Sequence, residues 1–297
     1  MKRVLITGAN SYIGVSVEKW LNQWKDEYEV NTLDMQKEDW REYDFSKYDS
    51  IFHVAGIAHA DVGKVSEDRK QLYYKVNCDL AKETAVKAKR AGVRQFIYMS
   101  SIIVYGDNQS IRRLCVITNH TPLSPANFYG DSKVQAEKKL EQLKTEQFKI
   151  AIIRPPMIYG KGGKGNYSLI SKLAQKMPIF PKVKNQRSML HIDNLCELVR
   201  MIIEHEESGV FMPQNKEYVE TSEMVKLIAK AHGKRPVLIP GFSWGIKLLS
   251  IIPGRIGNLT NKAFGNLVYD KELSMYYKGR YQIRGLEESI ILTEREE

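Results

Sequence analysis

A glycine-containing turn between a short apolar run and a helical pattern places the strongest constraint on the fold of this chain. The run Val4–Ile6 leads directly into Thr7–Gly14, which reads TGANSYIG, and the sequence then becomes helical. A strand, such a turn and a helix in this order are typical of a dinucleotide-binding site. Gly8 permits the tight turn, Gly14 lets the helix pack near the strand, and the amides at the helix start can bind a pyrophosphate. Ser11 stands where a central glycine is usual, but its hydroxyl can still donate to phosphate.

The first half of the chain alternates β-rich runs with longer amphipathic stretches. We expect strands over Val4–Thr7, Glu29–Leu33, Ile51–Val54, Phe96–Ser100 and Ile150–Arg154. We expect helices after Gly14, over Asp68–Ala91 and over Phe128–Leu143. This alternation is typical of a doubly wound parallel sheet with helices on both faces. The sequence therefore predicts an α/β, Rossmann-like fold.

The alternation becomes less regular after Arg154. Pro155-Pro156, a glycine-rich segment at 160–165 and prolines at 178 and 181 break the chain into short elements. We therefore expect a dinucleotide-binding domain over residues 1–154, with part of its core continuing beyond 154. A smaller mixed α/β lobe, mainly for substrate binding, is expected over residues 155–297.

Composition excludes several other classes of protein. The chain has 297 residues, 43% of them apolar, which is enough for a full core. Its net charge of +10 suits an anionic partner, but basic pairs such as Lys89-Arg90 lack interleaved aromatics and match no nucleic-acid motif. We expect no nucleic-acid partner. Cys78, Cys115 and Cys196 lie far apart without CxxC spacing, so neither a disulfide framework nor a zinc cluster is expected.

The widely spaced cysteines suit a reducing cytoplasm, and hydropathy predicts a soluble protein. No run of about 20 apolar residues, the length that a membrane span requires, is present, and the apolar run at the start is too short for a signal peptide. The segment Phe242–Ile252, rich in Trp, Ile and Leu, leaves two alternatives open. It can pack in the core of the smaller lobe, which we favour, or form an amphipathic helix on a membrane surface beside a basic region.

A carboxylate ends the second predicted strand. Asp34 follows Gly14 by twenty residues, where it would accept hydrogen bonds from the adenosine ribose and repel a 2′-phosphate. NAD is therefore favoured over NADP, although Lys37 nearby could partly offset the repulsion. Further contacts with the adenine and the second phosphate are expected from Asp44, Phe45, Val54, Ala55 and Gly56.

The most specific pattern is a tyrosine and a lysine four residues apart at the start of a predicted helix. Tyr129 and Lys133 lie on the same helix face at this spacing, and Ser100-Ser101 end a strand upstream. A phenol with a pKa of about 10 is a poor base at neutral pH. The Lys133 ammonium and a positive nicotinamide would lower the pKa of Tyr129, which could then accept or return a hydroxyl proton. Ser101 would hold the same substrate oxygen while hydride moves.

The order of five motifs resembles that of the extended short-chain dehydrogenase/reductase family, in particular its UDP-glucose 4-epimerase-like members of the NAD-dependent epimerase/dehydratase type. The motifs are TGxxxxxG, HVAG, SSxxVYG, YxxxK and RPxxxYG, and the resemblance covers nearly the whole chain. It implies that Ser101 is the catalytic hydroxyl and that Arg187 contacts a nucleotide diphosphate, which an arginine fork suits. Asn166 lies near the family's substrate-contacting asparagine. Met157 occupies a position that is commonly polar in the epimerases and would touch the sugar.

The resulting site has three groups of residues. The predicted catalytic residues are Ser101, Tyr129 and Lys133. The predicted cofactor contacts are Gly8, Asn10, Ser11, Tyr12, Ile13, Gly14, Asp34, Asp44, Phe45, Val54, Ala55, Gly56, Asn77, Ser100, Tyr129, Lys133 and Pro156. The predicted substrate contacts are Ser101, Tyr129, Met157, Asn166 and Arg187. No metal is expected, because His53, His59 and His191 show no metal-ligand spacing.

Departures from the family pattern narrow the reaction. Relatives that eliminate water carry an Asp-Glu pair where this chain has Ile102-Ile103, and decarboxylating relatives keep a Glu at the second position, so both reactions are disfavoured. We expect NAD-dependent 4-epimerisation of a nucleotide-diphosphate sugar, such as a UDP-sugar, through a 4-keto intermediate, for surface polysaccharide synthesis. A 4-ketosugar reductase using NAD(P)H stays open, and the intact catalytic set argues against a catalytically idle dinucleotide-binding protein. The family also implies a homodimer formed through Asp68–Ala91 and Phe128–Leu143.

Overall fold

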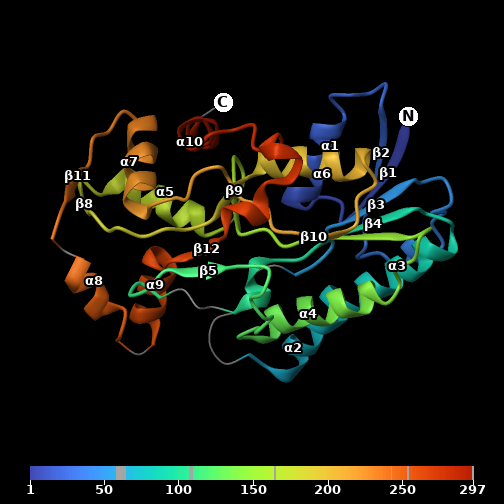
Figure 1. Ribbon diagram of the computed structural model, residues 1–297, viewed down its shortest axis with the longest axis horizontal. Helices are drawn as coiled ribbons and strands as arrows, with labels where there is room; N and C mark the ends of the chain where they lie inside the picture. Colours follow the sequence, from blue (N-terminus) through green and yellow to red (C-terminus); the bar gives the residue numbers. More distant parts are fainter. Residues whose placement is uncertain (58–64, 107–109, 164, 242, 253, 296–297) are drawn as a thin grey trace. The chain divides into compact units, whose positions relative to one another are not determined.

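The computed structural model describes residues 1–57, 65–106, 110–163, 165–241, 243–252 and 254–295 (Figure 1). The chain forms two compact units, each made of separate segments. Unit 1 comprises Met1–Asp107, Pro122–Pro155 and Leu195–Pro213. Unit 2 comprises Asn108–Thr121, Pro156–Asn194 and Gln214–Glu297. The functional assignment of residues 1–154 and 155–297 to cofactor and substrate stays a prediction.

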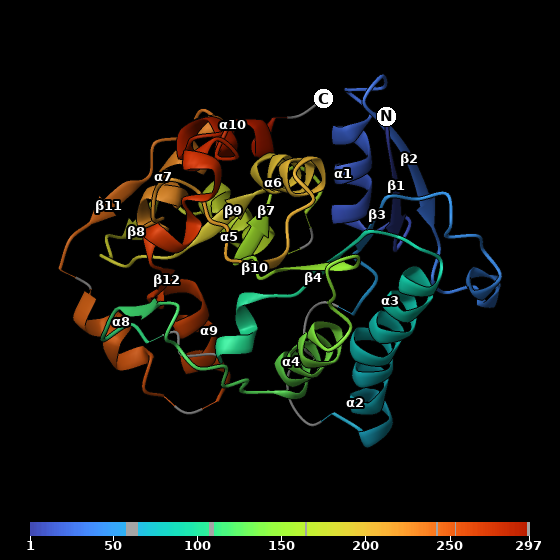
Figure 2. The same ribbon diagram turned by 45° about the vertical axis from the view of Figure 1, so that its right-hand side comes forward.

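A six-stranded parallel sheet is the centre of unit 1, with strand order β10-β6-β4-β3-β1-β2. Its strands are β1 (Lys2–Thr7), β2 (Tyr28–Leu33), β3 (Ser50–His53), β4 (Gln95–Met99), β6 (Lys149–Ile153) and β10 (Gly209–Phe211). Helices α1 and α6 lie on one face of the sheet and α2, α3 and α4 on the other (Figures 1 and 2). The predicted doubly wound α/β fold is therefore confirmed. From β1 the chain adds β2 on one side of the sheet, and it then adds β3 and β4 on the other side, so the strand order reverses at β1. Ligands usually bind at the carboxyl ends of the strands at such a point.

The helices of unit 1 differ from the predicted ones in two places. They are α1 (Tyr12–Leu21), α2 (Glu67–Tyr74), α3 (Leu80–Arg90), α4 (Phe128–Glu141) and α6 (Ile192–Glu204), with short 3₁₀ turns at Glu38–Arg41 and Ile102–Tyr105. The first helix begins before Gly14 rather than after it, because the Ser11 side chain caps it. The single helix predicted over Asp68–Ala91 is interrupted by a π-helical turn at Lys75–Asp79.

The core of unit 1 follows from the composition of its strands. Strands of a parallel sheet are covered on both faces and are therefore nearly continuously apolar. Val4, Leu5 and Ile6 of β1 are completely buried, as is every residue of β4 from Gln95 to Tyr98. The covering helices contribute small side chains such as Ala81 and Ala85, which let α3 lie close to the sheet.

Unit 2 is built around three small parallel sheets of two strands each. Their strands are β5 (Cys115–Ile117) with β12 (Leu267–Tyr269), β7 (Met157–Tyr159) with β9 (Met189–His191), and β8 (Ile179–Pro181) with β11 (Val237–Ile239). The helices are α5 (Asn166–Lys176), α7 (Thr221–Ala231), α8 (Ser243–Leu249), α9 (Arg255–Phe264) and α10 (Leu286–Glu294), with 3₁₀ turns at Lys271–Ser274 and Tyr276–Gly279. Tyr159, Met189, Ile228 and Ile290 form its main apolar core.

The core packing that the sequence favours for the segment Phe242–Ile252 is wrong for most of its side chains. Phe242 lies outside the described residues, and so does His59. Ile246 is buried, whereas the larger part of the segment points to solvent: Trp244, Leu248, Leu249, Ile251 and Ile252. Among the residues that the structure describes, no helix is both long and apolar enough to cross a bilayer.

Candidate active site

The glycine turn after β1 is held in close contact with the end of β3. Gly8 has a φ of +103°, and a Cβ added there would lie 2.7 Å from the amide nitrogen of Ala55. A Cβ on Gly14 would lie 3.1 Å from the carbonyl oxygen of Gly8 and 3.3 Å from Cγ1 of Val54. Both glycines are thus required for the close approach of helix, turn and strand.

Ser11 connects the turn to α1. Its Oγ accepts a hydrogen bond from the amide of Gly14 at 3.1 Å, and its own proton can still be donated to another acceptor. Tyr12 and Ile13 occupy the first turn of the helix, and Asn10 is exposed with a φ of +66°. Amides of the first helical turn have no partner within the helix, and the helix dipole favours an anion there.

The carboxylates predicted to contact adenosine lie in loops after β2. Asp34 follows β2, and its Oδ1 accepts from the amide of Gln36 at 3.0 Å. Asp44 is exposed and accepts from the amide and hydroxyl of Ser46, hydrogen bonds that lower its pKa. The side chain of Phe45 is buried in the core, so only its backbone can face a ligand.

Asn77 and Gly56 link the cofactor loop to the helix that carries the predicted catalytic pair. A Cβ on Gly56 would lie 2.9 Å from Oδ1 of Asn77 and 3.4 Å from Nζ of Lys133. Asn77, in the π-helical turn, accepts from the amide of Ile57 at 2.9 Å and donates to Oγ of Ser132 at 3.1 Å. π-Helical turns of this kind are frequent at functional sites.

The structure brings Ser101, Tyr129 and Lys133 together. Asn127 caps α4 by accepting from the amide of Gly130 at 2.9 Å, which places Tyr129 in the first turn. Ser101, just after β4, lies close enough to the phenol of Tyr129 to lower its pKa. Lys133 donates from Nζ to the carbonyl of Met99 at 2.9 Å. The end of β4, the residue after it and the first turns of α4 thus bring the three side chains to one region of unit 1.

Without a bound cofactor, the pKa of Tyr129 is raised, whereas the sequence predicted that it would be lowered. Burial raises the pKa of Tyr129 to about 12, and the nearby Ser101 hydroxyl acts in the opposite direction. Burial also lowers the pKa of Lys133 to about 8, while the nearby Glu137 raises it. Because the cost of desolvation dominates both groups, the predicted lowering of the pKa of Tyr129 is not produced by these side chains alone.

The sequence interpretation missed a buried charge network beside this site. Arg154 forms a fork on Glu137, with Nη2 2.6 Å from Oε2 and Nε 3.1 Å from Oε1. Ser100 donates to the same carboxylate, and Arg154 donates to the hydroxyl of Tyr105 at 2.7 Å. Glu137 lies one turn after Lys133 on the buried face of α4. The signal for this network in the sequence is an acidic residue, Glu137, on the helix face that packs on the sheet, because a buried carboxylate needs a charged or hydrogen-bonding partner.

The predicted substrate contacts of unit 2 have different environments. Arg187 is buried, and its Nη1 donates to the carbonyl of Ala263 at 3.4 Å. No carboxylate pairs with Arg187 within the described part of the chain, and burial lowers its pKa to about 10. A buried guanidinium with one long hydrogen bond is well suited to an anionic ligand. Asn166 is exposed at the start of α5, and Met157 is partly buried against the core.

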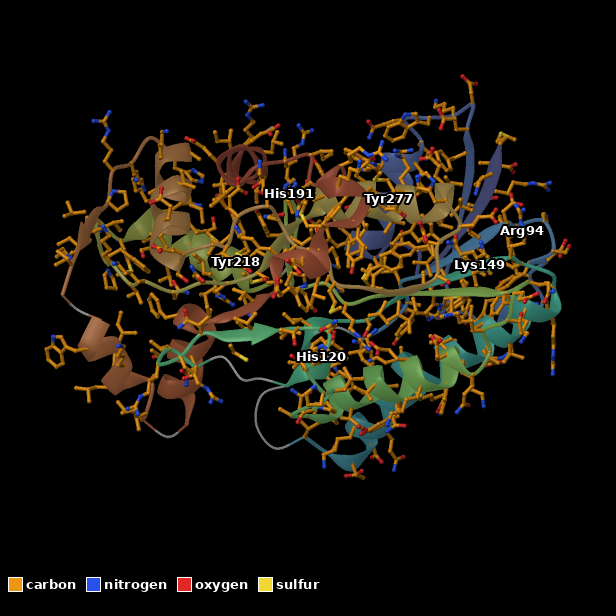
Figure 3. All side chains as sticks on the ribbon, viewed as in Figure 1. Arg94, His120, Lys149, His191, Tyr218 and Tyr277 are labelled. Atoms are coloured by element: carbon orange, nitrogen blue, oxygen red, sulfur yellow. The ribbon has the colours of Figure 1, made fainter. Side chains whose placement is uncertain are left out.

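Three further positions that the sequence singled out are buried. Pro156 is buried where unit 2 begins. His53 is buried with Nδ1 2.7 Å from the hydroxyl of Thr7, and desolvation lowers its pKa to about 3. His191, at the end of β9, accepts from the amide of Asp193 at 3.3 Å (Figure 3). His53 therefore stays neutral at pH 7, and burial also lowers the pKa of His191.

Comparison with known proteins places this geometry in a family. The model of the NAD dependent epimerase/dehydratase family matches residues 4–212. The chain is 29% identical over 291 residues to a UDP-glucose 4-epimerase of Vibrio cholerae, covering 91% of this chain and 87% of that protein. It is 29% identical over 196 residues to an N-acetyl-α-D-glucosaminyl-diphospho-ditrans,octacis-undecaprenol 4-epimerase of Escherichia coli O157:H7, covering 63% and 56% of the two chains.

A solved structure supports the fold. The structure of a dTDP-4-dehydrorhamnose reductase from Clostridium acetobutylicum matches with a TM-score of 0.72 and 19% identity, covering 98% of each chain. At 19% identity, this likeness is evidence for the fold alone.

Proposed function

The chain belongs to the NAD-dependent epimerase/dehydratase family, and from that premise we propose that it inverts carbon 4 of the sugar in a nucleotide-diphosphate sugar. It is an enzyme whose cofactor is NAD. The main support for the proposal is that Ser101, Tyr129 and Lys133 lie near the end of β4. Beside them, the loop after β3 has a glycine where a Cβ would be too close to its neighbours. This arrangement can move a proton on and off one sugar hydroxyl.

The residues present fit NAD. The approach of Gly8 to Ala55 leaves no room for a Cβ, so a pyrophosphate would approach the backbone closely at the start of α1. Ser11 offers a hydroxyl proton at the start of α1, and Asp34 offers a carboxylate for the ribose hydroxyls. When bound, NAD supplies a hydride acceptor that can later return the hydride.

The chain's own residues supply the proton relay. Ser101 would hold the 4-hydroxyl of the sugar by a hydrogen bond, and Tyr129 would take its proton as the 4-keto intermediate forms. Lys133 is a cation one helical turn away, and a nearby positive charge stabilises a phenolate. Tyr129 would return a proton to the same oxygen as the turned keto sugar regains the hydride, so that proton and hydride would both be restored and no net oxidation would remain. The apolar Ile102 and Ile103 offer no acid for elimination of water.

Arg187 supports a diphosphate in the substrate. It is a buried cation without a carboxylate partner in the described ranges, and a guanidinium fork matches phosphate oxygens. Both relatives are named for a substrate in which a sugar is attached to a diphosphate. The diphosphate is carried on a nucleoside in one substrate and on undecaprenol in the other. We favour the UDP-sugar, because the first match spans most of both chains.

One experiment tests this function. Purified protein receives a panel of UDP-sugars with catalytic NAD, and the products are identified by NMR. We expect interconversion of a pair that differs only at carbon 4, with no lasting change in nicotinamide absorbance. If no sugar is converted while a 4-ketosugar is reduced with excess NADH or NADPH, the second candidate function, a 4-ketosugar reductase, replaces the first. That candidate is kept because a dTDP-4-dehydrorhamnose reductase has the same fold.

Two finer expectations stay predictions. The undecaprenol-linked substrate in the name of one relative supports a role in surface polysaccharide synthesis. A homodimer would use α2, α3 and α4, the helices that replace the two predicted ones. Sedimentation of the purified protein measures its oligomeric state.

A further inference from the structure

The segment from α8 to the turn after it carries exposed apolar side chains in unit 2. Trp244 is 68% exposed, Leu248 56% and Ile251 53%, and Leu249 and Ile252 are exposed by more than two fifths. Ile246 turns inward, where it packs with Ile111 and Val183. A continuous group of exposed apolar side chains is the usual mark of an interaction surface.

A basic pocket lies beside this apolar segment. It has a volume of about 560 Å³, and its lining includes Arg112, Arg113, Lys182, Lys184 and Lys247. All five cations are exposed, and no Asp or Glu lines the pocket among the residues that the structure describes. Lys247 belongs to α8 itself, so the cations and the apolar side chains form one surface, which we name the α8 surface.

The stretches of chain that form the α8 surface carry no acidic residue. Residues 108–130, 147–192 and 224–269 contain no Asp or Glu, and every residue that lines the pocket comes from one of these three stretches. The stretches lie far apart in the chain and are brought together only by folding. The segments that line the pocket therefore contribute positive and no negative side chains, which suits a partner with many negative charges.

The α8 surface is separate from the proposed diphosphate contact. Exposure alternates along residues 182–187: Lys182 and Lys184 are exposed, whereas Val183, Asn185 and Arg187 are buried. Arg187 does not line the basic pocket in the described structure. The two groups of cations thus face different surroundings within unit 2.

We propose that unit 2 docks on an anionic lipid bilayer through the α8 surface, with lipid phosphates at the basic pocket and the apolar side chains of α8 in the headgroup region. Apolar side chains next to lysine and arginine match the boundary between acyl chains and phosphates, and tryptophan is favoured at that depth. A free phosphate would leave the apolar side chains in water. A second copy would place like charges face to face.

Vesicle binding by the full-length protein tests the proposal. The protein is sedimented with vesicles of phosphatidylglycerol and phosphatidylcholine, and with vesicles of phosphatidylcholine alone. We expect binding to the anionic vesicles at least ~10-fold tighter, weakened by salt, together with a blue shift of tryptophan emission that the Trp244→Phe variant loses. Equal binding to both vesicles, or none to either, overturns the proposal.

Two sets of variants separate the apolar from the electrostatic part. Leu248→Ser with Ile251→Ser, and independently Arg112→Gln with Arg113→Gln, should each weaken binding to anionic vesicles by at least ~10-fold. The matched controls are Leu173→Ser, also exposed in unit 2, and Lys25→Gln with Lys216→Gln. These controls should bind as the unmodified protein does. Equal losses in controls and variants contradict the proposal.

The same variants distinguish the other occupants. If Leu248→Ser with Ile251→Ser converts a dimer to a monomer while vesicle binding is absent, a second copy covers the surface and the proposal fails. If inorganic diphosphate binds at the basic pocket but vesicles do not, the site serves a free phosphate compound and the proposal also fails. Far-UV circular dichroism and turnover of the variants, both expected to be unchanged, show that the fold is intact.

Discussion

Glu137 and Arg154 form a two-point ion pair on the side of α4 that also carries Lys133. Nη2 of Arg154 lies 2.6 Å from Oε2 of Glu137, and both side chains are largely buried. Burial lowers the pKa of Lys133, whereas the charge of Glu137, one turn along the helix, raises it. The carboxylate thus helps to keep Lys133 protonated near neutral pH, which connects a structural ion pair to the proton relay.

Replacement of the phenol tests the proposed base. Tyr129→Phe should lower kcat by at least ~10²-fold, the usual scale for a general acid–base group, with NAD affinity nearly unchanged. Tyr218→Phe removes a phenol in unit 2 that donates to the carbonyl of Tyr269 and serves as the control. Initial rates on the active UDP-sugar measure the effect. A Tyr129→Phe enzyme within threefold of the unmodified rate would remove Tyr129 from the mechanism.

The ion pair predicts a pH dependence. Lys133 is a cation below its pKa of about 8, so kcat/KM should fall as the pH rises through that value. Glu137→Gln removes the charge that raises the pKa of Lys133 and leaves Arg154 as a nearby cation. The alkaline limb should therefore move to lower pH. Glu141→Gln, on the exposed part of the same helix, is the control.

The two pH profiles separate this effect from a loss of fold. A structural defect would lower kcat/KM at every pH without moving the limb. An unchanged limb in Glu137→Gln, in protein that retains its circular dichroism, would show that Glu137 does not act on Lys133.

Asp34 should decide between the two nicotinamide cofactors. Its carboxylate follows β2 and suits ribose hydroxyls, while repelling a 2′-phosphate. We expect NAD to bind more tightly than NADP, and Asp34→Ser to reduce that preference by at least ~10-fold. Titration of tryptophan fluorescence with each cofactor measures both constants, with Asp39→Ser as a control from the following loop. A preference for NADP in the unmodified protein would show that a cation such as Lys37 overrides Asp34.

Arg187 should affect the substrate rather than the cofactor. Arg187→Ala removes a buried cation that has no carboxylate partner in the described part of unit 2. We expect KM for the nucleotide sugar to rise by at least ~10-fold with kcat changed less, because a guanidinium binds the diphosphate in both ground and transition states. The NAD dissociation constant is the control measurement. Loss of NAD binding with an unchanged KM would place Arg187 elsewhere.

The sequence by itself determined the features that depend on near neighbours in the chain. The strand before Gly8, the tight turn and the shared face of Tyr129 and Lys133 follow from backbone geometry over a few residues. The α/β alternation likewise predicted the parallel sheet. The family resemblance predicted the cofactor, NAD, and the family match over residues 4–212 supports that prediction.

Tertiary structure decided what depends on residues distant in the chain. Glu137 and Arg154 meet only because β6 lies beside β4 and α4 packs on that part of the sheet, so no local pattern predicts their ion pair. The raised pKa of Tyr129 depends on how completely the fold removes water from its phenol. The exposure of the Trp244 side chain also depends on distant residues. Hydropathy reports how apolar a segment is, but the exposure of the segment depends on whether another element covers it.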